Sequence, residues 1–333
     1  NAKSVKSLTA SHRFALTGTP IENSLSELWS IFDFIMPYYL LSHAKFVKQY
    51  EKQILKNDEN ALNDLNKRIR PFILRRMKKD VLTELPEKVE TKFLTDLTLE
   101  QKKTYLSYLE NFRGEFFGSE LSEEFDYRVV EHNKLQILTA LMRLRQICCH
   151  PSTFLENYEG GSGKLELFKQ ILPDLISNGH RILIFSQFTA MLEILANTIK
   201  ELGYEHFYLE GNTKVSLRNE FVKRFNAGER DVFLISLKAG GTGLNLTGAD
   251  TVIHFDPWWN PAVEDQATDR AHRIGQKNSV QVIKLITKGT IEEKIFKLQK
   301  KKKQLSESVI EAKEVFINSL NKEELEELFS FDL

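Results

Sequence analysis

The chain has 333 residues, with 46 Lys plus Arg and 46 Asp plus Glu, so its formal net charge at pH 7 is zero. At roughly 150 residues per domain, this length predicts about two domains. With 41% hydrophobic and 28% charged residues, and with 16 Gly and 8 Pro, the composition indicates an ordinary globular protein and excludes disordered and collagen-like chains. The charge balance argues only weakly against nucleic acid as a partner, because a local basic patch serves as well as a net excess.

The first part, 1–75, is expected to contain one buried strand and several helices. A short apolar run at 14–16 leads into Thr17-Gly-Thr-Pro20, which is typical of a strand that enters a sharp turn. Apolar residues at helical spacing follow from Leu25 to Ile35, and Pro37 ends that pattern. One strand and a few helices do not make a domain, so we interpret this part as the end of a domain that begins upstream.

The middle part, 76–160, is expected to be a mainly helical insertion. Apolar residues recur at three- and four-residue spacing over 99–117 and 133–147, and the acidic stretch 115–126 between them is interpreted as a solvated connection. Gly160-Gly-Ser-Gly-Lys164 resembles a Walker A loop only superficially, because no Ser or Thr follows the lysine, and we expect a flexible linker.

The third part, 161–310, has the clearest pattern. Apolar, β-branched runs at 182–185, 206–209, 232–237, 251–255 and 280–286 alternate with segments long enough for helices at 191–202, 215–226 and 262–272. This alternation predicts an α/β fold with a mainly parallel sheet flanked by helices. Ligands on such sheets bind at the carboxyl ends of the strands. The last segment, 311–333, is expected to be an acidic C-terminal helix.

Two features of the sequence bear on metal binding, membrane association and the cellular compartment. The two cysteines, Cys148 and Cys149, are adjacent and indicate a reducing environment; we interpret them as buried thiols, because no second Cys/His pair stands at zinc-ligand spacing. The longest weakly charged stretch, 28–44, is shorter than the roughly 20 residues that span a bilayer. We therefore expect no metal site in this chain, no membrane association and a cytoplasmic location, or a nuclear one if the source is eukaryotic.

The strongest candidate site follows the run at 251–255. Asn260-Pro261 is a helix-start signal, and Gln266, Arg270 and Arg273 would share one face of the expected helix at i, i+4 and i+7. Two guanidinium groups and an amide on one face suit a multiply charged oxyanion such as a triphosphate. The spacing alone slightly favours a surface face paired with neighbouring carboxylates.

Small polar residues follow the other strand ends. After 232–237 come Lys238 and the glycines of 240–243, whose backbone N–H groups can approach a phosphate closely. Ser186-Gln187 follows the first run and Gly211 the second. Each signal alone fits a turn or a helix cap as well. Of the pair Trp258-Trp259, one ring is expected in the core and the other could lie on a sugar–phosphate surface.

In this order the motifs resemble the Swi/Snf family of ATP-dependent DNA translocases, in helicase superfamily two. Their amino-acid sequences are closest to those of bacterial members. The segment 16–29 is similar to motif III, 182–188 to motif IV, 236–246 to motif V and 266–276 to motif VI, while 72–80 and 144–151 resemble blocks between the two lobes. The Walker A loop and the Asp-Glu box, which precede motif III in the family, match nothing in this sequence. The resemblance implies that 1–75 ends the first RecA-like lobe, 76–160 is the helical protrusion and 161–310 is the second RecA-like lobe.

The resemblance also implies residue roles. Arg270 and Arg273 would be arginine fingers that complete an ATP site between the lobes, a contribution typically worth about 10³–10⁵ in rate. The residues implied to be catalytic are Arg270, Arg273 and Gln266. The residues implied to bind ATP are Gly241, Gly243, Asn245, Arg270 and Arg273. The residues implied to hold DNA are Ser186, Gln187, Gly211, Ser236, Lys238, Thr242 and Trp258. Those implied to couple nucleotide state to DNA grip are Thr17, Gly18 and Thr19.

We therefore expect the C-terminal half of an ATP-dependent double-stranded-DNA translocase or helicase-like motor that remodels protein–DNA complexes. Its cofactors would be ATP and Mg²⁺, bound mainly by the first lobe. Its partners would be double-stranded DNA and the first RecA-like lobe of the same longer chain, with a DNA-bound protein complex as a further candidate. The alternative is a non-enzymatic lobe that binds DNA or protein and has no ATPase activity as an isolated fragment.

Overall fold

The computed structural model describes residues 2–17, 25–54, 58–74, 76, 78–82, 84–117, 134–240, 243–306 and 328–330. Its contacts divide the chain into two units, here called the N-terminal unit (Asn1–Val81 with Lys302–Asn321) and the sheet unit (Leu82–Lys301 with Lys322–Leu333). The boundary between these two units follows Val81, and the domain bounds expected after residues 75, 160 and 310 stay predictions. The stretch 76–160 is not a unit of its own, because most of it belongs with the sheet.

The N-terminal unit is helical in its described part. Its elements are α1 (Ala2–Lys6), α2 (Leu25–Ile35), α3 (His43–Phe46), the π-helical turn η1 (Val47–Glu51), α4 (Lys52–Ile54), α5 (Glu59–Ile69), the 3₁₀ turn η2 (Arg70–Phe72) and α6 (Lys78–Val81). The helix α2 has the bounds that its periodicity predicts. The apolar faces of these elements meet in one core that includes Phe32, Phe46 and Leu65.

The buried strand expected at 14–16 is not formed, and that prediction is wrong for this structure. Phe14 is 84% exposed and Leu16 is fully exposed. A strand must pair its backbone N–H and C=O groups with a neighbouring strand, and the described part of the N-terminal unit contains helices and irregular segments only. Thr17 is exposed, while Gly18 and Thr19 lie outside the described residues.

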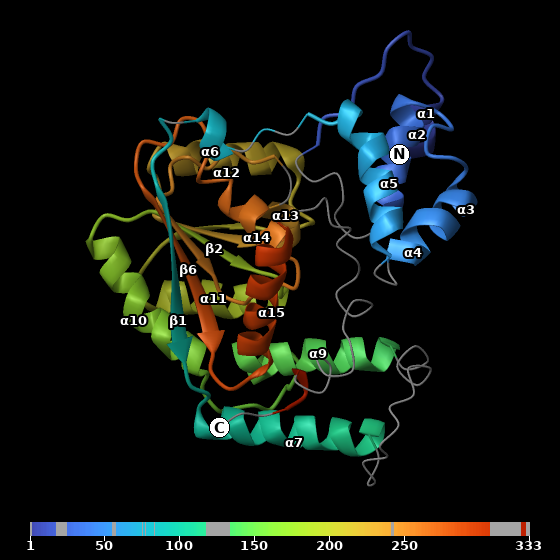
Figure 1. Ribbon diagram of the computed structural model, residues 1–333. Helices are drawn as coiled ribbons and strands as arrows, with labels where there is room; N and C mark the ends of the chain where they lie inside the picture. Colours follow the sequence, from blue (N-terminus) through green and yellow to red (C-terminus); the bar gives the residue numbers. More distant parts are fainter. Residues whose placement is uncertain are drawn as a thin grey trace. The chain divides into compact units, whose positions relative to one another are not determined.

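The sheet unit is built on six parallel strands in the order β1-β6-β5-β2-β4-β3 (Figure 1). The strands are β1 (Lys88–Thr95), β2 (Ile182–Ser186), β3 (His206–Leu209), β4 (Val232–Ser236), β5 (Thr251–His254) and β6 (Val280–Thr287). Strands β2 to β6 lie where the apolar runs predict them, within one residue at each end. The parallel α/β sheet flanked by helices is thereby confirmed.

The strand β1 lies within the segment that was expected to be helical. It pairs with β6 along eight residues, from Lys88 opposite Val280 to Thr95 opposite Thr287. Strand β1 is at the edge of the sheet, five of its eight side chains are polar, and no residue in it is fully buried. The sequence signal of β1 is therefore much weaker than that of the strands whose side chains are mostly buried.

Helices cover both faces of the sheet. They are α7 (Leu99–Phe117), α9 (Lys134–Cys149), the 3₁₀ turn η3 (Pro151–Thr153), α10 (Gly163–Ser177), α11 (Thr189–Glu201), α12 (Val215–Asn226), α13 (Leu237–Gly240), α14 (Pro261–Thr268) and α15 (Ile291–Ser306). Alternate residues of β2 join two separate cores: Leu183 and Phe185 pack with α12 and α14, whereas Ile182 and Ile184 pack with α10 and α11. None of the described helices is both long and apolar enough to cross a bilayer.

The expected helical insertion consists of α7 and α9, which lie side by side (Figure 1). The bounds of α7 are those predicted, and α9 extends two residues beyond the predicted end. The acidic connection expected at 115–126 lies mostly outside the described residues. The helix expected at 311–333 also lies outside them, apart from 328–330.

The glycine-rich segment before α10 is packed, so the prediction of a flexible linker is wrong. Ser162 is the N-cap of α10, where its hydroxyl accepts from the N–H of Leu165 and donates to the carbonyl of Cys149 at 2.5 Å. A Cβ on Gly163 would lie 1.9 Å from the carbonyl oxygen of Asp96. Glycine is required at 163 because another backbone approaches it, not because the chain must move.

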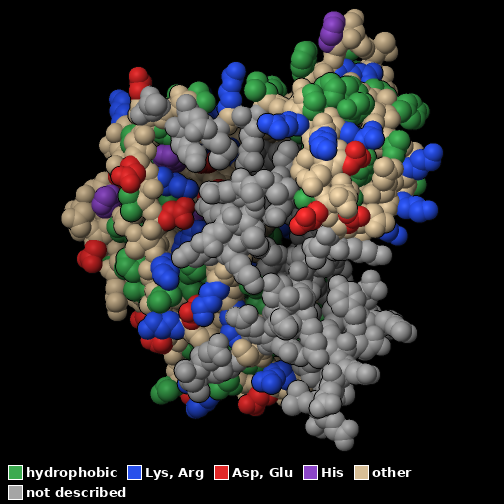
Figure 2. All heavy atoms as spheres, in the orientation of Figure 1, with side chains coloured by type: hydrophobic (Ala, Val, Ile, Leu, Met, Phe, Trp, Pro, Cys, Tyr) green, Lys and Arg blue, Asp and Glu red, His purple; other side chains and the backbone are tan. Residues whose placement is uncertain are grey.

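Positive and negative side chains are interspersed on the surface of the sheet unit. Figure 2 shows Lys and Arg scattered among Asp and Glu on the visible face, without one large field of either sign. This distribution agrees with the zero net charge. On this face, recognition of an anion would therefore come from a few placed groups.

Candidate functional site

The candidate site is the edge of the sheet where the strands β2, β4 and β5 end. In the register of these strands Ser186 pairs with Ser236, and Phe185 pairs with His254. Because the strands are parallel, their carboxyl ends converge, and the loops that carry motifs IV, V and VI meet there. The predicted residues Ser186, Gln187, Ser236 and Lys238 are brought to this edge.

The two serines are engaged inside the protein. The hydroxyl of Ser186, which is buried, donates to Oδ1 of Asp256 at 2.5 Å and accepts from the N–H of Phe188 at 3.1 Å. Ser236 is also buried, and its hydroxyl accepts from the N–H of Ala239 at 3.4 Å. These hydroxyls order the loops that follow the strands. Lys238, in contrast, is exposed.

The loop after β3 is held by an arginine that the sequence analysis did not single out. The guanidinium of Arg218 donates to the carbonyls of Thr213 and Gly211, each at 2.7 Å, and to that of Glu210 at 3.3 Å. Gly211 itself is exposed, and a Cβ at this position would meet open space. The loop carbonyls thus point at Arg218.

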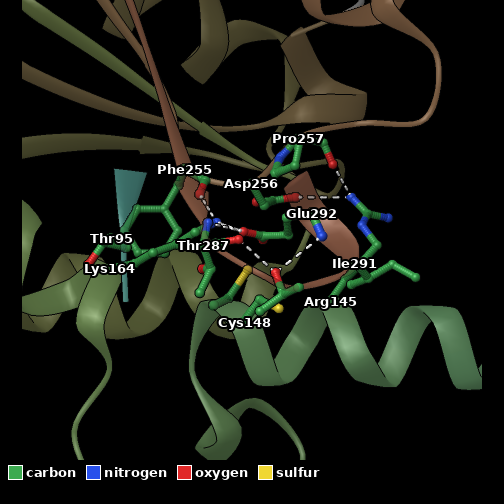
Figure 3. A network of polar contacts seen from close by, with 12 residues as sticks. Thr95, Arg145, Cys148, Lys164, Phe255, Asp256, Pro257, Thr287, Ile291 and Glu292 are labelled. Atoms are coloured by element: carbon green, nitrogen blue, oxygen red, sulfur yellow. Dashed lines mark hydrogen bonds and ion pairs between the residues drawn. The ribbon is translucent and has the colours of Figure 1, made fainter. Parts of the chain in front are cut away.

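Arg145 is a second residue that sequence reasoning missed. It comes from α9 and is almost completely buried. Its guanidinium donates to Oε1 of Gln187 at 3.1 Å. It also donates to the carbonyl of Pro257 and lies 3.6 Å from Oδ2 of Asp256 (Figure 3). Its position in a block resembling the Swi/Snf family was the available signal, but helical periodicity does not place it at the strand ends.

Asp256 is a buried carboxylate that follows β5 at this edge of the sheet. Burial raises its pKa to about 6, although the Arg145 charge and the Ser186 hydrogen bond act in the opposite direction. The backbone N–H of Gln187 also points at the carboxylate, at 3.3 and 3.4 Å from its two oxygens. One carboxylate therefore joins α9 to the ends of β2 and β5.

Trp258 is half-buried and packs against the core between the sheet and α12 and α14. Its backbone N–H donates to Oε1 of Glu264 at 2.6 Å. Glu264, itself buried, is paired with Lys284 of β6 at 2.8 Å. The position of Trp258 is thus determined by a buried charged group on α14.

Motif VI departs from the expected geometry. The helix α14 ends at Thr268, so Gln266 lies on it while Arg270 and Arg273 lie beyond it. The carbonyl of Arg270 accepts from the N–H of Leu246, 24 positions earlier, rather than continuing the helix. The prediction that the three residues share one helical face is therefore wrong.

The loop that carries the two arginines is held by Gln276, which is buried. Its Nε2 donates to the carbonyls of Ala249 at 2.7 Å, Ala271 at 3.0 Å and Thr247 at 3.3 Å. Its Oε1 accepts from the two N–H groups that follow it, and Gly275 before it has a φ of +99°. One amide side chain therefore ties motif VI to the loop after motif V.

Arg270 is affected by burial and by the charge of Arg273. Arg270 is half-buried, and its Nε donates to the carbonyl of Gly240 at 2.9 Å. Burial and the charge of Arg273 lower the pKa of Arg270, while Asp269 acts in the opposite direction. Arg273 is exposed. A region where two cations disfavour each other is one where a polyanion would be stabilised.

Of the other residues implied to bind ATP, Gly243 and Asn245 are exposed in the loop after β4, and Gly243 has a φ of +28°. The carbonyl of Asn245 accepts from Nδ2 of Asn226 at 2.9 Å. Gly241 and Thr242 lie outside the described residues.

The described residues contain no group of three or more His, Cys, Asp or Glu that could hold a metal ion. The described side chains thus do not by themselves fit a complete Mg²⁺ site. The interpretation of Cys148 and Cys149 as buried thiols is confirmed: both are fully buried, and burial raises the pKa of each thiol.

A parallel six-stranded sheet with helices on both faces, and with its charged loops gathered at the strand ends, defines a RecA-like α/β domain. Two family models match the chain: the SNF2-related domain over residues 1–153 and the helicase conserved C-terminal domain over residues 163–275. The second match covers the strands β2 to β5 and the loops described above.

Solved and curated relatives agree with these matches. The chain is 38% identical to the Sulfolobus solfataricus SWI2/SNF2 ATPase core in complex with dsDNA, covering 100% of this chain and 69% of that one, with a TM-score of 0.61. It is 41% identical to the putative ATP-dependent helicase/translocase YwqA of Bacillus subtilis, and 41% identical to an uncharacterized ATP-dependent helicase of Mycoplasma pneumoniae. The alignments include 99% and 98% of this chain but span only 36% and 30% of those relatives. The chain belongs to the SNF2 family of ATP-dependent helicases and translocases.

Proposed function

We propose that this chain is the C-terminal half of an ATP-dependent double-stranded-DNA translocase that remodels protein–DNA complexes. In this proposal Arg270 and Arg273 complete an ATP site whose remainder belongs to a first lobe, and the strand-end loops hold the DNA backbone. The observation that carries it is the contact of Arg270 with the carbonyl of Gly240, at the edge of the sheet where ligands bind in this class of fold, with the charge of Arg273 acting on Arg270.

The two arginines suit phosphoryl transfer. Negative charge on the transferred phosphoryl group would relieve the repulsion between them, and an arginine placed there is worth about 10³–10⁵ in rate. ATP and Mg²⁺ supply the phosphate chain and its countercharge when bound. The sequence contains no Walker A loop, so most contacts to the phosphates and the metal are assigned to the first lobe of the longer protein.

The proposed DNA contacts lie beside the nucleotide residues. Lys238 is exposed just after β4, and Gly211 is exposed in a loop whose carbonyls point at Arg218. Contacts of this kind read phosphates and not bases, as tracking along a duplex requires. That the Sulfolobus relative was solved with double-stranded DNA supports the choice of duplex.

The test is the ATPase activity of the longer protein that contains this chain, with and without duplex DNA. We expect Arg270→Ala to lower DNA-stimulated turnover by at least about 10³, while the dissociation constant for DNA stays within about threefold, a change of less than 1 kcal/mol. Arg224→Ala serves as the matched control, because Arg224 is on the surface of α12 and pairs with Glu220 and Glu229. Normal ATP turnover by the Arg270→Ala protein would show that Arg270 is not part of the ATP site.

The 333-residue chain alone is the second arm of the same experiment. We expect it to show negligible DNA-stimulated hydrolysis, which is also what the non-enzymatic alternative predicts. The alternative is distinguished by the longer protein: if that protein binds DNA without hydrolysing ATP, the non-enzymatic lobe is the correct description. Robust hydrolysis by the isolated chain would contradict both.

A further inference from the structure

Arg145 connects the helical insertion to two loops at the edge of the sheet. It lies on α9, and its guanidinium donates to Gln187 after β2 at 3.1 Å and to the carbonyl of Pro257 after β5. It also lies over the rings of Trp259 and Trp258, at 4.8 and 5.5 Å from their centroids. One planar group thus contacts residues from both loops; Figure 3 shows its contacts with Asp256 and Pro257.

The helix that carries Arg145 is firmly attached to the sheet unit. The amide of Gln101, at the start of α7, donates to the carbonyls of Ile147 at 2.7 Å and Cys148 at 3.2 Å and accepts from the N–H of Gly163 at 3.2 Å. The hydroxyl of Tyr105 accepts from the N–H of Ile291, the first residue of α15, at 3.0 Å. The insertion therefore provides a fixed base for the Arg145 side chain.

The arrangement is poorly explained by stability alone. Arg145 and Asp256 are both buried but are separated by 3.6 Å, and buried ion pairs are often no better for stability than apolar replacements of the same volume. The Nε of Arg145 and the Nε2 of Gln187 are buried without a hydrogen-bond partner in the described part of the chain. Each such group is unfavourable for stability, because it loses its hydrogen bonds to water without replacing them. A packed apolar side chain would avoid these penalties but would not hold the two loops in register.

We propose that Arg145 is a positioning residue for DNA-dependent activation, which fixes the Gln187 amide and the Trp258-Trp259 pair relative to each other. It does not touch the nucleotide, and it acts through the loops that meet the duplex. The inference rests on the proposed function, because it takes Gln187 and Trp258 to be at the DNA surface. Its consequence is that the helical insertion determines how strongly DNA stimulates ATP turnover, and not how fast ATP is hydrolysed without DNA.

The first experiment uses Arg145→Met in the longer protein. We expect the DNA concentration for half-maximal stimulation to rise about tenfold, equivalent to about 1.4 kcal/mol. The DNA-independent rate and the KM for ATP are expected to stay within about twofold, because the contacts of Arg270 are not altered. Arg143→Met is the matched control: Arg143 is on the same helix and lies over Phe154 at 4.7 Å, but it contacts neither loop. Equal DNA dependence in Arg145→Met and wild type overturns the proposal.

The second experiment separates positioning from charge balance. In Arg145→Met the buried carboxylate of Asp256 loses its partner, so the double variant Arg145→Met/Asp256→Asn is expected to recover the stability that the single variant loses. It still lacks the donors to Gln187 and Pro257, so we expect it to keep the weakened DNA response. A double variant with normal DNA stimulation would show that Arg145 only balances the charge of Asp256, and would overturn the proposal even if Arg145→Met alone does not fold.

Arg145→Lys provides a third variant, which keeps the positive charge but lacks the planar fork. We expect normal stability and a DNA response between those of wild type and Arg145→Met. The outcome for the proposed function remains separate: if the wild-type longer protein shows no DNA-stimulated hydrolysis, the proposed function fails. If the wild type is stimulated and all three variants match it, only the role of Arg145 fails.

Discussion

His254 shows how burial at the end of β5 controls a single titratable group. Its ring stacks on Phe185 with centroids 5.6 Å apart, and its Nε2 lies 2.9 Å from Oγ1 of Thr268 on α14. Burial, more than the nearby Lys284 charge, lowers the pKa of His254 to about 4, although Glu264 acts in the opposite direction. The imidazole is therefore neutral at pH 7 and anchors α14 to the sheet.

The depressed pKa predicts how stability depends on pH. In the unfolded chain His254 binds a proton below about pH 6.5, whereas in the folded protein it does so only below about pH 4. The stability that a neutral His254 contributes is present above pH 6.5 and is lost as the pH falls toward 4, by up to about 1.4 kcal/mol per pH unit. In His254→Gln this loss is absent.

The measurement is urea unfolding of wild type and His254→Gln between pH 7.5 and pH 4.5, at constant ionic strength. We expect the wild type to be the more stable at pH 7.5 and its advantage to decrease steadily below pH 6.5. Taking the difference between the two proteins removes the contributions of all other titratable groups that they share. A difference in the free energy of unfolding that is constant with pH would contradict the buried neutral imidazole.

At the scale of elements, the Lys164–Glu292 ion pair joins the start of α10 to the start of α15. Both side chains are completely buried, with Nζ 2.6 Å from the carboxylate and 2.8 Å from the carbonyl of Phe255 (Figure 3). The second carboxylate oxygen accepts from the N–H of Thr287 at the end of β6 at 3.1 Å. This one ion pair therefore connects two helices and the ends of two strands.

We expect Lys164→Met to destabilise the protein by about 3–5 kcal/mol, because it leaves the Glu292 carboxylate buried without its partner. The double variant Lys164→Met/Glu292→Gln should recover much of this loss, since Gln can still accept from Thr287. Lys169→Met is the control on the same helix; its pair with Glu166 is exposed, and such pairs contribute about 0–1 kcal/mol. Equilibrium unfolding in urea measures all three. A single variant as stable as the control would show that the pair contributes no net stability.

Elements buried on both faces could be predicted from sequence, whereas those set by distant contacts could not. Continuous apolar runs predict the strands β2 to β6, but no such run marks β1, because five of its eight side chains are polar. The end of α14 depends on Leu246 and Gln276, which local periodicity does not detect. Motif spacing predicts that Ser186, Ser236 and Lys238 lie at one edge of the sheet. It does not reveal Arg145, whose partners lie 42 and 112 positions away.

At the scale of the whole molecule, the zero net charge limits how the proposed binding of DNA can arise, and the charges on the face seen in Figure 2 are interspersed. A protein without a large positive field gains its affinity from a small number of placed phosphate contacts. Each such contact releases counterions, so the dependence of binding on salt counts them. Affinity should also be nearly the same for duplexes of unrelated sequence, because phosphates carry no base information.

Lys238 provides the test of this picture. It is exposed directly after β4, on the short helix α13 that ends at Gly240. If its ammonium group neutralises one phosphate, Lys238→Ala should reduce the slope of log K against log salt concentration by about 0.9. The loss of affinity should be equal for two duplexes of unrelated sequence. The measurement is fluorescence anisotropy of labelled duplexes with the longer protein over a series of salt concentrations. Lys169→Ala, a surface lysine on α10, is the matched control and should leave the slope unchanged. An unchanged slope in Lys238→Ala, or a loss confined to one sequence, would mean that Lys238 does not contact the phosphate backbone.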